Sequence, residues 1–198
     1  MAEVFARMVS LAMISIFTQN AIFDRAFGIN VAIYASRKTS HIIGFTVAIT
    51  LMTTFASAAA YPFDLMLLPS ENGYLYMPLI YVGIVGVLYL LGLFALWGFF
   101  PKTYYKVNKY AHLAIFNCTV FGALFLNYNF GKGFAGYVGY GFGTGIGFFL
   151  ACFLLNIAHE RLNNDKIPRA FRGYPIMLVF IGIISLAFNV LVGYTAEF

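Results

Sequence analysis

The sequence predicts an all-α integral membrane protein of about six transmembrane helices, and three observations lead to this prediction. Apolar residues make up 62% of the 198 residues, and Asp, Glu, Lys and Arg only 10%, whereas soluble domains carry about 25% charged residues. The apolar residues gather in runs of about 20, the length that crosses a bilayer. The basic residues lie between these runs, so the net charge of +5 indicates topology and not a nucleic-acid footprint. We therefore expect one polytopic domain over 1–198, embedded in lipid and without a nucleic-acid partner.

The apolar runs give the expected crossings in order. They cover residues 3–23, 42–60, 78–99, 111–130, 134–157 and 174–195. A further apolar piece at 26–35 is too short to cross the bilayer, and we interpret it as half a helix. The first run carries Glu3 early and lacks a small-residue cleavage site, which favours a first span over a cleaved signal peptide.

The basic residues predict the orientation of these spans. Ten of the twelve fall in the first, third and fifth connections: Arg25, Arg37, Lys38, Lys102, Lys106, Lys109, Arg161, Lys166, Arg169 and Arg172. Arg7 and Lys132 fall on the opposite side, where Asp64 also lies beyond the end of the second span. Because cytoplasmic connections collect Lys and Arg, we expect both termini on the non-cytoplasmic side.

The third connection divides the chain into halves of about 1–100 and 101–198, with three expected spans in each. An odd number of spans per half means that a structural repeat would be inverted in the membrane. The first span of each half carries asparagine in an interrupted apolar run, Asn20 and Asn30 in one and Asn117 in the other. We interpret both as broken helices, and corresponding interruptions in two halves indicate a site near the midplane.

Asn30 and Cys118 are the residues that this reasoning brings to one depth. Asn30 precedes Arg37 by seven residues and Cys118 follows Lys109 by nine, so at roughly 1.5 Å per residue both lie about 10–14 Å from the cytoplasmic face. The alternative for Cys118 is simple packing of a small residue. For Cys152, inside an apolar run, packing is the interpretation that we favour.

Two further features allow a structural and a functional interpretation. Asp24 and Arg25 are acid-base neighbours in an apolar region, either a functional intramembrane pair or a pair at the interface with Arg25 extended towards water. Glycine recurs every four residues in the fifth apolar run, which predicts close approach of other helices. The glycines concerned are Gly139, Gly143 and Gly147 in one series and Gly141 and Gly145 in another.

The chain also carries short motifs in a fixed order. In the first half they are Asn20, Gly28, Ser36-Arg37-Lys38 and Thr53-Thr54-Phe55-Ala56-Ser57. In the second half they are Asn117-Cys118 with Val120 and Gly122 through Asn127, Tyr140-Gly141-Phe142 through Glu160-Arg161-Leu162, and Pro168 with Phe171-Arg172-Gly173 and Ser185-Leu186-Ala187-Phe188. In identity and spacing these motifs resemble the Rnf-Nqr family, which comprises the A-type membrane subunit of the Rnf complex and its paralogue in the sodium-translocating NADH:quinone oxidoreductase.

The resemblance implies a six-helix subunit built as an inverted three-plus-three repeat whose first helix in each half is broken. It implies that the partners are a homologous six-helix membrane subunit, flavin-bearing subunits and ferredoxin-like subunits, in a bacterial or archaeal cytoplasmic (inner) membrane. In this family two cysteines from each member of the pair hold a 2Fe-2S cluster. Cys118 corresponds to the second cysteine. Asn30 replaces the first, and an amide oxygen is a poor iron ligand compared with a thiolate.

We therefore expect a membrane subunit of an Rnf/Nqr-like complex that carries electrons across the membrane and translocates Na⁺ or H⁺, with no catalysis by this chain in isolation. The expected cofactor site contains Cys118, Asn30, Asn117 and Asn20, with Cys118 as the metal ligand. Two alternatives stay open. One is the solute-binding membrane component of an uptake transporter, and the other is a redox-inactive structural paralogue that keeps the scaffold.

Overall fold

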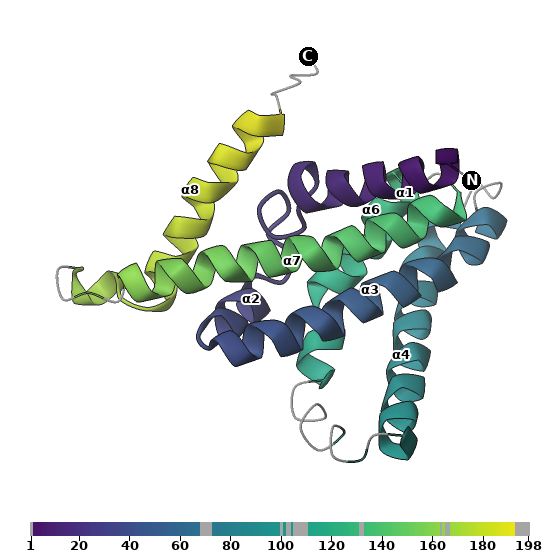
Figure 1. The fold of residues 1–198 in the computed structure, drawn as a ribbon, viewed down its shortest axis with the longest axis horizontal. Helices are drawn as coiled ribbons and strands as arrows, with labels where there is room; N and C mark the ends of the chain where they lie inside the picture. The colour runs from purple at the N-terminus through teal and green to yellow at the C-terminus, as the bar shows by residue number, and fades with distance from the viewer. Residues whose placement is uncertain are drawn as a thin grey trace.

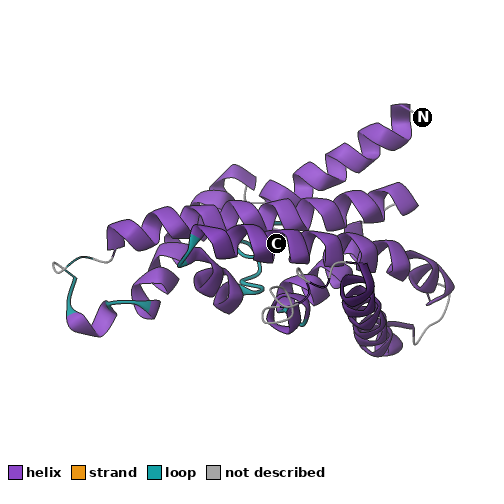
Figure 2. Cartoon of the chain, turned by 60° about the horizontal axis from the view of Figure 1, so that its bottom comes forward, coloured by secondary structure: helices purple, strands orange, loops and turns teal. Residues whose placement is uncertain are grey.

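The computed structural model describes residues 2–67, 73–99, 101, 104, 111–130, 133–162, 164 and 167–192. Within these ranges all regular structure is helical, as predicted (Figure 2). Four helices are long and apolar enough to cross a membrane, and a shorter apolar helix covers Tyr174–Val190. The four are Thr39–Leu67, Gly73–Gly98, Ala111–Phe130 and Phe134–Leu162. The chain is therefore an all-α, multi-pass membrane protein.

The helices follow the chain in the predicted order (Figure 1). They are α1 (Ala2–Met13), the π-helical η1 (Ile14–Thr18), α2 (Ile29–Ser36), α3 (Thr39–Leu67), α4 (Gly73–Phe99), α6 (Cys118–Phe130), α7 (Phe134–Leu162), the 3-10 turn η2 (Arg169–Phe171) and α8 (Tyr174–Val192). The predicted end of the last span, at 193–195, lies outside the described residues. So do Lys102, Lys106, Lys109, Lys132 and Lys166, and the orientation of the termini stays a prediction, as does the division into halves.

Both predicted helix breaks are present. In the first half, the chain leaves η1 at Thr18 and makes turns before α2 begins at Ile29, so the apolar piece at 26–35 is the second part of the broken helix. In the second half, the helix that contains residues 111–115 is interrupted at Phe116 and Asn117, and α6 begins at the next residue. The prediction of a broken first helix in each half is confirmed.

The prediction for the second span is wrong at its C-terminal end, because the helix is longer than predicted. The sequence predicts its end at residue 60 and Asp64 beyond it, whereas α3 continues to Leu67 with Pro62 inside the helix. A proline is tolerated in a membrane helix where neighbouring helices satisfy the freed backbone groups. As a result Asp64 is a helical residue, and only 1% of its surface is exposed.

α7 lies between α1 and α3 (Figure 1). One glycine series faces α1: a Cβ at Gly139 would lie 2.3 Å from the carbonyl oxygen of Met8, and a Cβ at Gly143 would lie 2.4 Å from that of Ala12. Residue numbers rise together on the two helices, so α1 and α7 run parallel. The predicted close approach of another helix is confirmed on this side.

The other glycine series faces α3. A Cβ at Gly141 would lie 2.5 Å from the carbonyl oxygen of Thr53, and one at Gly145 would lie 2.5 Å from the Cα of Thr50. The hydroxyl of Thr53 donates a 2.7 Å hydrogen bond to the carbonyl of Gly141. Numbers rise on one helix as they fall on the other, so α3 and α7 are antiparallel. Small residues on two faces thus let α7 contact two neighbours at backbone distance.

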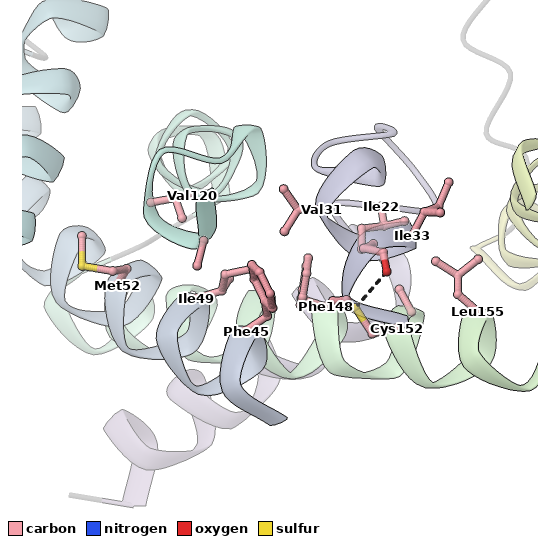
Figure 3. Packing of buried hydrophobic residues seen from close by; sticks show 14 of the residues in the cluster. Ile22, Val31, Ile33, Phe45, Ile49, Met52, Val120, Phe148, Cys152 and Leu155 are labelled. Atoms are coloured by element: carbon pink, nitrogen blue, oxygen red, sulfur yellow. Dashed lines mark hydrogen bonds between the residues drawn. The ribbon is translucent and has the colours of Figure 1, made fainter. Parts of the chain in front are cut away.

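Apolar side chains of α2, α3 and α7 fill the space beside these contacts (Figure 3). Phe148 of α7 lies in one buried cluster with Phe45 and Ile49 of α3 and with Val31 and Ile33 of α2. Because lipid tails are as apolar as these side chains, the helices are held by close packing and not by exclusion from water. This packing fixes the short helix α2, and with it the first break, against α7.

Two helices extend away from this core. In Figure 1, α4 and α8 diverge from the group formed by α1, α3, α6 and α7. Their outer faces carry large apolar side chains, including Phe94, Trp97, Leu186 and Val190, each more than half exposed. Such faces fit lipid or another membrane subunit.

The glycine contact with α1 gives a first prediction. Gly143→Ala should lower the free energy of unfolding in detergent by about 1–3 kcal/mol, because the new methyl group collides with the backbone of α1. Gly182→Ala is the matched control, since nothing lies within 4 Å of the Cβ position in α8. The control should be neutral or stabilising by up to about 1 kcal/mol. Equal effects of the two substitutions on chemical unfolding curves would contradict the packing described above.

Candidate functional site

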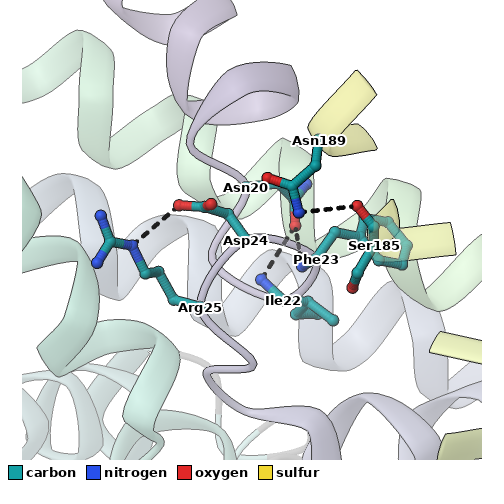
Figure 4. A network of polar contacts seen from close by, with 7 residues as sticks. All are labelled: Asn20, Ile22, Phe23, Asp24, Arg25, Ser185 and Asn189. Atoms are coloured by element: carbon teal, nitrogen blue, oxygen red, sulfur yellow. Dashed lines mark hydrogen bonds and ion pairs between the residues drawn. The ribbon is translucent and has the colours of Figure 1, made fainter. Parts of the chain in front are cut away.

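Asn20 holds the first break together (Figure 4). Its side-chain oxygen accepts hydrogen bonds from the backbone N–H groups of Ile22, at 3.0 Å, and Phe23, at 3.2 Å. Its amide nitrogen donates to the carbonyls of Ile16, at 2.8 Å, and Gly147 of α7, at 3.2 Å. Lipid cannot satisfy the backbone groups that a break sets free, so this one buried side chain satisfies them from within the protein.

Asn117 begins the second half-helix. Its carbonyl accepts the first helical hydrogen bond from the N–H of Val120, at 3.0 Å, and its side-chain oxygen accepts from the N–H of Thr119, at 3.3 Å. This is the geometry of a helix N-cap. The amide nitrogen of Asn117 is buried and has no hydrogen-bond partner in the described part of the chain.

The two breaks lie against each other. The hydroxyl of Thr119 donates a 3.1 Å hydrogen bond to the carbonyl of Phe27. Gly28 has a φ of 75°, and a Cβ there would lie 2.1 Å from the Thr119 hydroxyl oxygen, so both the backbone conformation and the space require glycine. Gly122 leaves room for the ring of Phe27, which would lie 2.2 Å from a Cβ at that position. The two interruptions are thus in direct contact, while their depth below the cytoplasmic face stays a prediction.

A cavity of about 450 Å³ lies where the breaks meet. The first break and α2 supply one wall, the second break supplies another, and the start of α8 supplies a third. The lining residues are Ala26, Gly28, Ile29, Asn30, Val31, Leu113, Phe116, Asn117, Cys118, Tyr174 and Leu178. The structure therefore brings together Asn30, Asn117 and Cys118, whereas Asn20 does not line the cavity.

The polar side chains that line the cavity differ in their hydrogen bonding. The oxygen of Asn30 accepts a short hydrogen bond from the hydroxyl of Tyr174 at the start of α8. Cys118 is exposed at the cavity and makes no such bond among the described residues. Tyr174 is a lining residue that the sequence reasoning missed, and no local motif marks it, because it reaches Asn30 across 144 positions of the chain.

Cys152 lies elsewhere. It is fully buried among the apolar side chains of the core, with its sulfur 3.9 Å from the carbonyl oxygen of Ala32 (Figure 3). It does not line the cavity. This placement agrees with the packing interpretation.

Asp24 and Arg25 form an ion pair at the first break, with 2.9 Å between the guanidinium nitrogen and the carboxylate oxygen (Figure 4). Their side chains are 25% and 50% exposed, respectively. The eight residues of α2, about 12 Å of helix, lie between the first break and Arg37. Asp24 and Arg25 precede α2, so the ion pair is part of the first break.

The donor set can be compared with the needs of a 2Fe-2S cluster, which takes four thiolates. No group of three or more His, Cys, Asp or Glu side chains gathers to hold a metal in the described residues. At the cavity this chain offers one thiol, Cys118, while the oxygen of Asn30 is already bonded to Tyr174. These residues fit one corner of a shared cluster and do not fit the two-thiolate share that the family resemblance implies.

Comparison with known proteins gives matches along nearly the whole chain. The family model described as "Rnf-Nqr subunit, membrane protein" matches residues 8–195. The A subunit of the ion-translocating oxidoreductase complex of Actinobacillus pleuropneumoniae serotype 5b (strain L20) is 31% identical over 189 residues, 95% of each chain. The A subunit of the Na(+)-translocating ferredoxin:NAD(+) oxidoreductase complex of Acetobacterium woodii is 30% identical over 175 residues, 88% of this chain and 91% of the relative. The matched regions include both helix breaks.

The hydrogen bonds at the first break give a second prediction. Asn20→Ala should lower the free energy of unfolding by about 1–3 kcal/mol, because it leaves buried backbone groups without partners. Asn189→Ala is the control, since Asn189 is exposed and, among the residues that the structure describes, bonds only to the Ser185 carbonyl of its own helix. That change should stay within about 0.5 kcal/mol. Chemical unfolding in detergent measures the free energy of unfolding of both variants. If Asn20→Ala leaves that free energy unchanged, Asn20 does not stabilise the break.

Proposed function

Because this chain belongs to the Rnf-Nqr family of membrane subunits, we propose that it is a membrane subunit of an ion-translocating electron-transfer complex. In this proposal Cys118 is one thiolate ligand of an iron-sulfur site shared with a partner. The chain performs no catalysis in isolation. The names of the relatives favour this function over the solute-binding component of an uptake transporter.

The observation that supports the proposal most directly is the cavity at the meeting point of the two breaks. It places an exposed cysteine at a pocket in a membrane protein, at the residue where α6 begins. Asn30 is exposed beside it, so the cavity is open at the side where a second chain could complete a ligand set. Thiolates are the usual ligands of iron-sulfur clusters.

The proposed partner at this cavity is a homologous six-helix subunit, which supplies the remaining thiolates. The apolar outer faces of α4 and α8 offer surface for lipid and for such a subunit. Flavin-bearing and ferredoxin-like subunits complete the proposed assembly. Its proposed location is a bacterial or archaeal cytoplasmic membrane, with both termini of this chain outside.

A second candidate function is a scaffold subunit without redox chemistry. The hydrogen bond between Tyr174 and Asn30 favours it, because the position that would need a thiolate is occupied by an amide with a settled partner. In this case the fold would position neighbouring subunits, and Cys118 would be dispensable.

Iron analysis of the assembled complex tests the first candidate. Cys118→Ser should lower the content of iron and acid-labile sulfide by about two atoms each per complex, because one ligand of a two-iron cluster is lost. Cys152→Ser is the matched control and should leave both contents unchanged, since Cys152 lies in the apolar core. If Cys118→Ser keeps full iron content and full electron transfer, the iron-sulfur role of this chain is refuted.

Restoring a thiol at position 30 separates the two candidates. The double substitution Asn30→Cys with Tyr174→Phe removes the hydrogen bond and adds a second thiol beside Cys118. If the cavity is an iron-sulfur site, cluster occupancy should rise above that of Tyr174→Phe alone. An unchanged, iron-free cavity would support the scaffold function.

A further inference from the structure

A buried carboxylate lies away from the cavity, near the end of the bundle where α7 begins. Asp64 of α3 is 1% exposed. One of its oxygens accepts a 2.8 Å hydrogen bond from the hydroxyl of Tyr81 in α4. The other accepts a 2.9 Å hydrogen bond from the hydroxyl of Tyr137 in α7. Polar side chains from three helices, α3, α4 and α7, are thus hydrogen-bonded to one another inside the bundle.

A fourth helix joins this group. Asn127 of α6, which is fully buried, donates a 3.0 Å hydrogen bond to the backbone carbonyl of Tyr137. Its side-chain oxygen has no partner among the described residues. The polar groups therefore form one network that links α3, α4, α6 and α7.

The other titratable groups near Asp64 are also tyrosines. On α3 itself, the ring of Tyr61 packs edge-to-face on Tyr137 at 5.2 Å between centroids. On α6, Tyr128 lies near Tyr81 and Tyr137. No Lys, Arg or His in the described ranges pairs with Asp64, whereas Asp24 has Arg25. Within the described part of the chain, the carboxylate thus has hydrogen-bond donors but no countercharge.

A charged carboxylate without a countercharge is costly inside a membrane bundle. The two phenol donors satisfy both carboxylate oxygens, but they do not cancel the charge. A proton bound to the carboxylate does cancel its charge. A phenol hydroxyl can accept a hydrogen bond as well as donate one, so it can also bond to the protonated acid. The same two phenols can therefore hydrogen-bond to the ionised and to the neutral acid.

We propose that Asp64, Tyr81 and Tyr137 form a proton-binding site, in which Asp64 takes up one proton from water and returns it. The O–H bond forms at one carboxylate oxygen and breaks again on release, so no other reactant is needed. Asp64 lies three residues before the end of α3, and Tyr137 three residues after the start of α7. The site is thus about one helical turn from the end of the bundle, where water is within reach.

The geometry favours a proton over a metal cation. Hard metal cations bind through several oxygens and usually keep waters. Asp64 is 1% exposed, and each of its oxygens already accepts a phenol hydroxyl, so the carboxylate leaves no free position for a metal cation and its coordinated waters. The inference does not rest on the iron-sulfur proposal, because no electron carrier takes part.

Infrared difference spectroscopy of the purified full-length chain in detergent tests the site. Lowering the pH should produce the carbonyl band of a protonated buried acid, and Asp64→Asn should remove one carboxyl equivalent from it. Tyr81→Phe should keep the band but shift it to higher frequency, because the acid loses a hydrogen-bond partner. Asp24→Asn is the matched control and should leave the band in place, since Asp24 is partly exposed and paired with Arg25.

Three results would overturn the proposal. The first is a pH-dependent spectrum of Asp64→Asn that equals that of the parent. The second is a band that does not change with pH, which would mean that no proton is exchanged. The third is removal of the band by Na⁺ at constant pH, which would identify a metal cation as the ligand. If Asp64→Asn does not fold, Tyr81→Phe and Tyr137→Phe decide, because unshifted bands in both would also refute the site.

Discussion

The need to satisfy backbone groups inside a membrane is the constraint on which the rest of this structure depends. A broken helix leaves N–H and C=O groups that lipid cannot bond. At the first break Asn20 takes up two N–H groups and reaches a carbonyl of α7, and at the second break Asn117 caps α6. The bond from Thr119 to Phe27 then joins the two breaks. The cavity exists because both breaks are stabilised in the same place.

The glycines of α7 make this arrangement possible. Gly143 and Gly147 bring α7 close enough to the first broken helix for Asn20 to reach its backbone. Gly141 and Gly145 do the same for α3. A single helix with small residues on two faces therefore sets the positions of its neighbours, and the apolar cluster around Phe148 fixes α2 beside it.

The helices and their interruptions were predictable, because apolar run length and interrupting asparagines are local signals. Contacts between distant residues were not: nothing near Asn30 indicates Tyr174, and nothing near Asn20 indicates Gly147. The early end that we assigned to the second span has a clear reason. Pro62 and Asp64 are typical of a connection, yet α3 continues through both, and the hydroxyls of Tyr81 and Tyr137 satisfy the buried Asp64 carboxylate. The hydrogen-bond partners of Asp64 come from α4 and α7, so the sequence around Asp64 does not indicate them.

The breaks have one more consequence, which concerns the electric field in the cavity. Both α2 and α6 begin at its wall, so the positive ends of two helix dipoles point into it. Each is equivalent to about half an elementary charge, and the low dielectric of the membrane weakens that field little. The two helix N-termini therefore contribute positive potential at the cavity, which favours negative charge there.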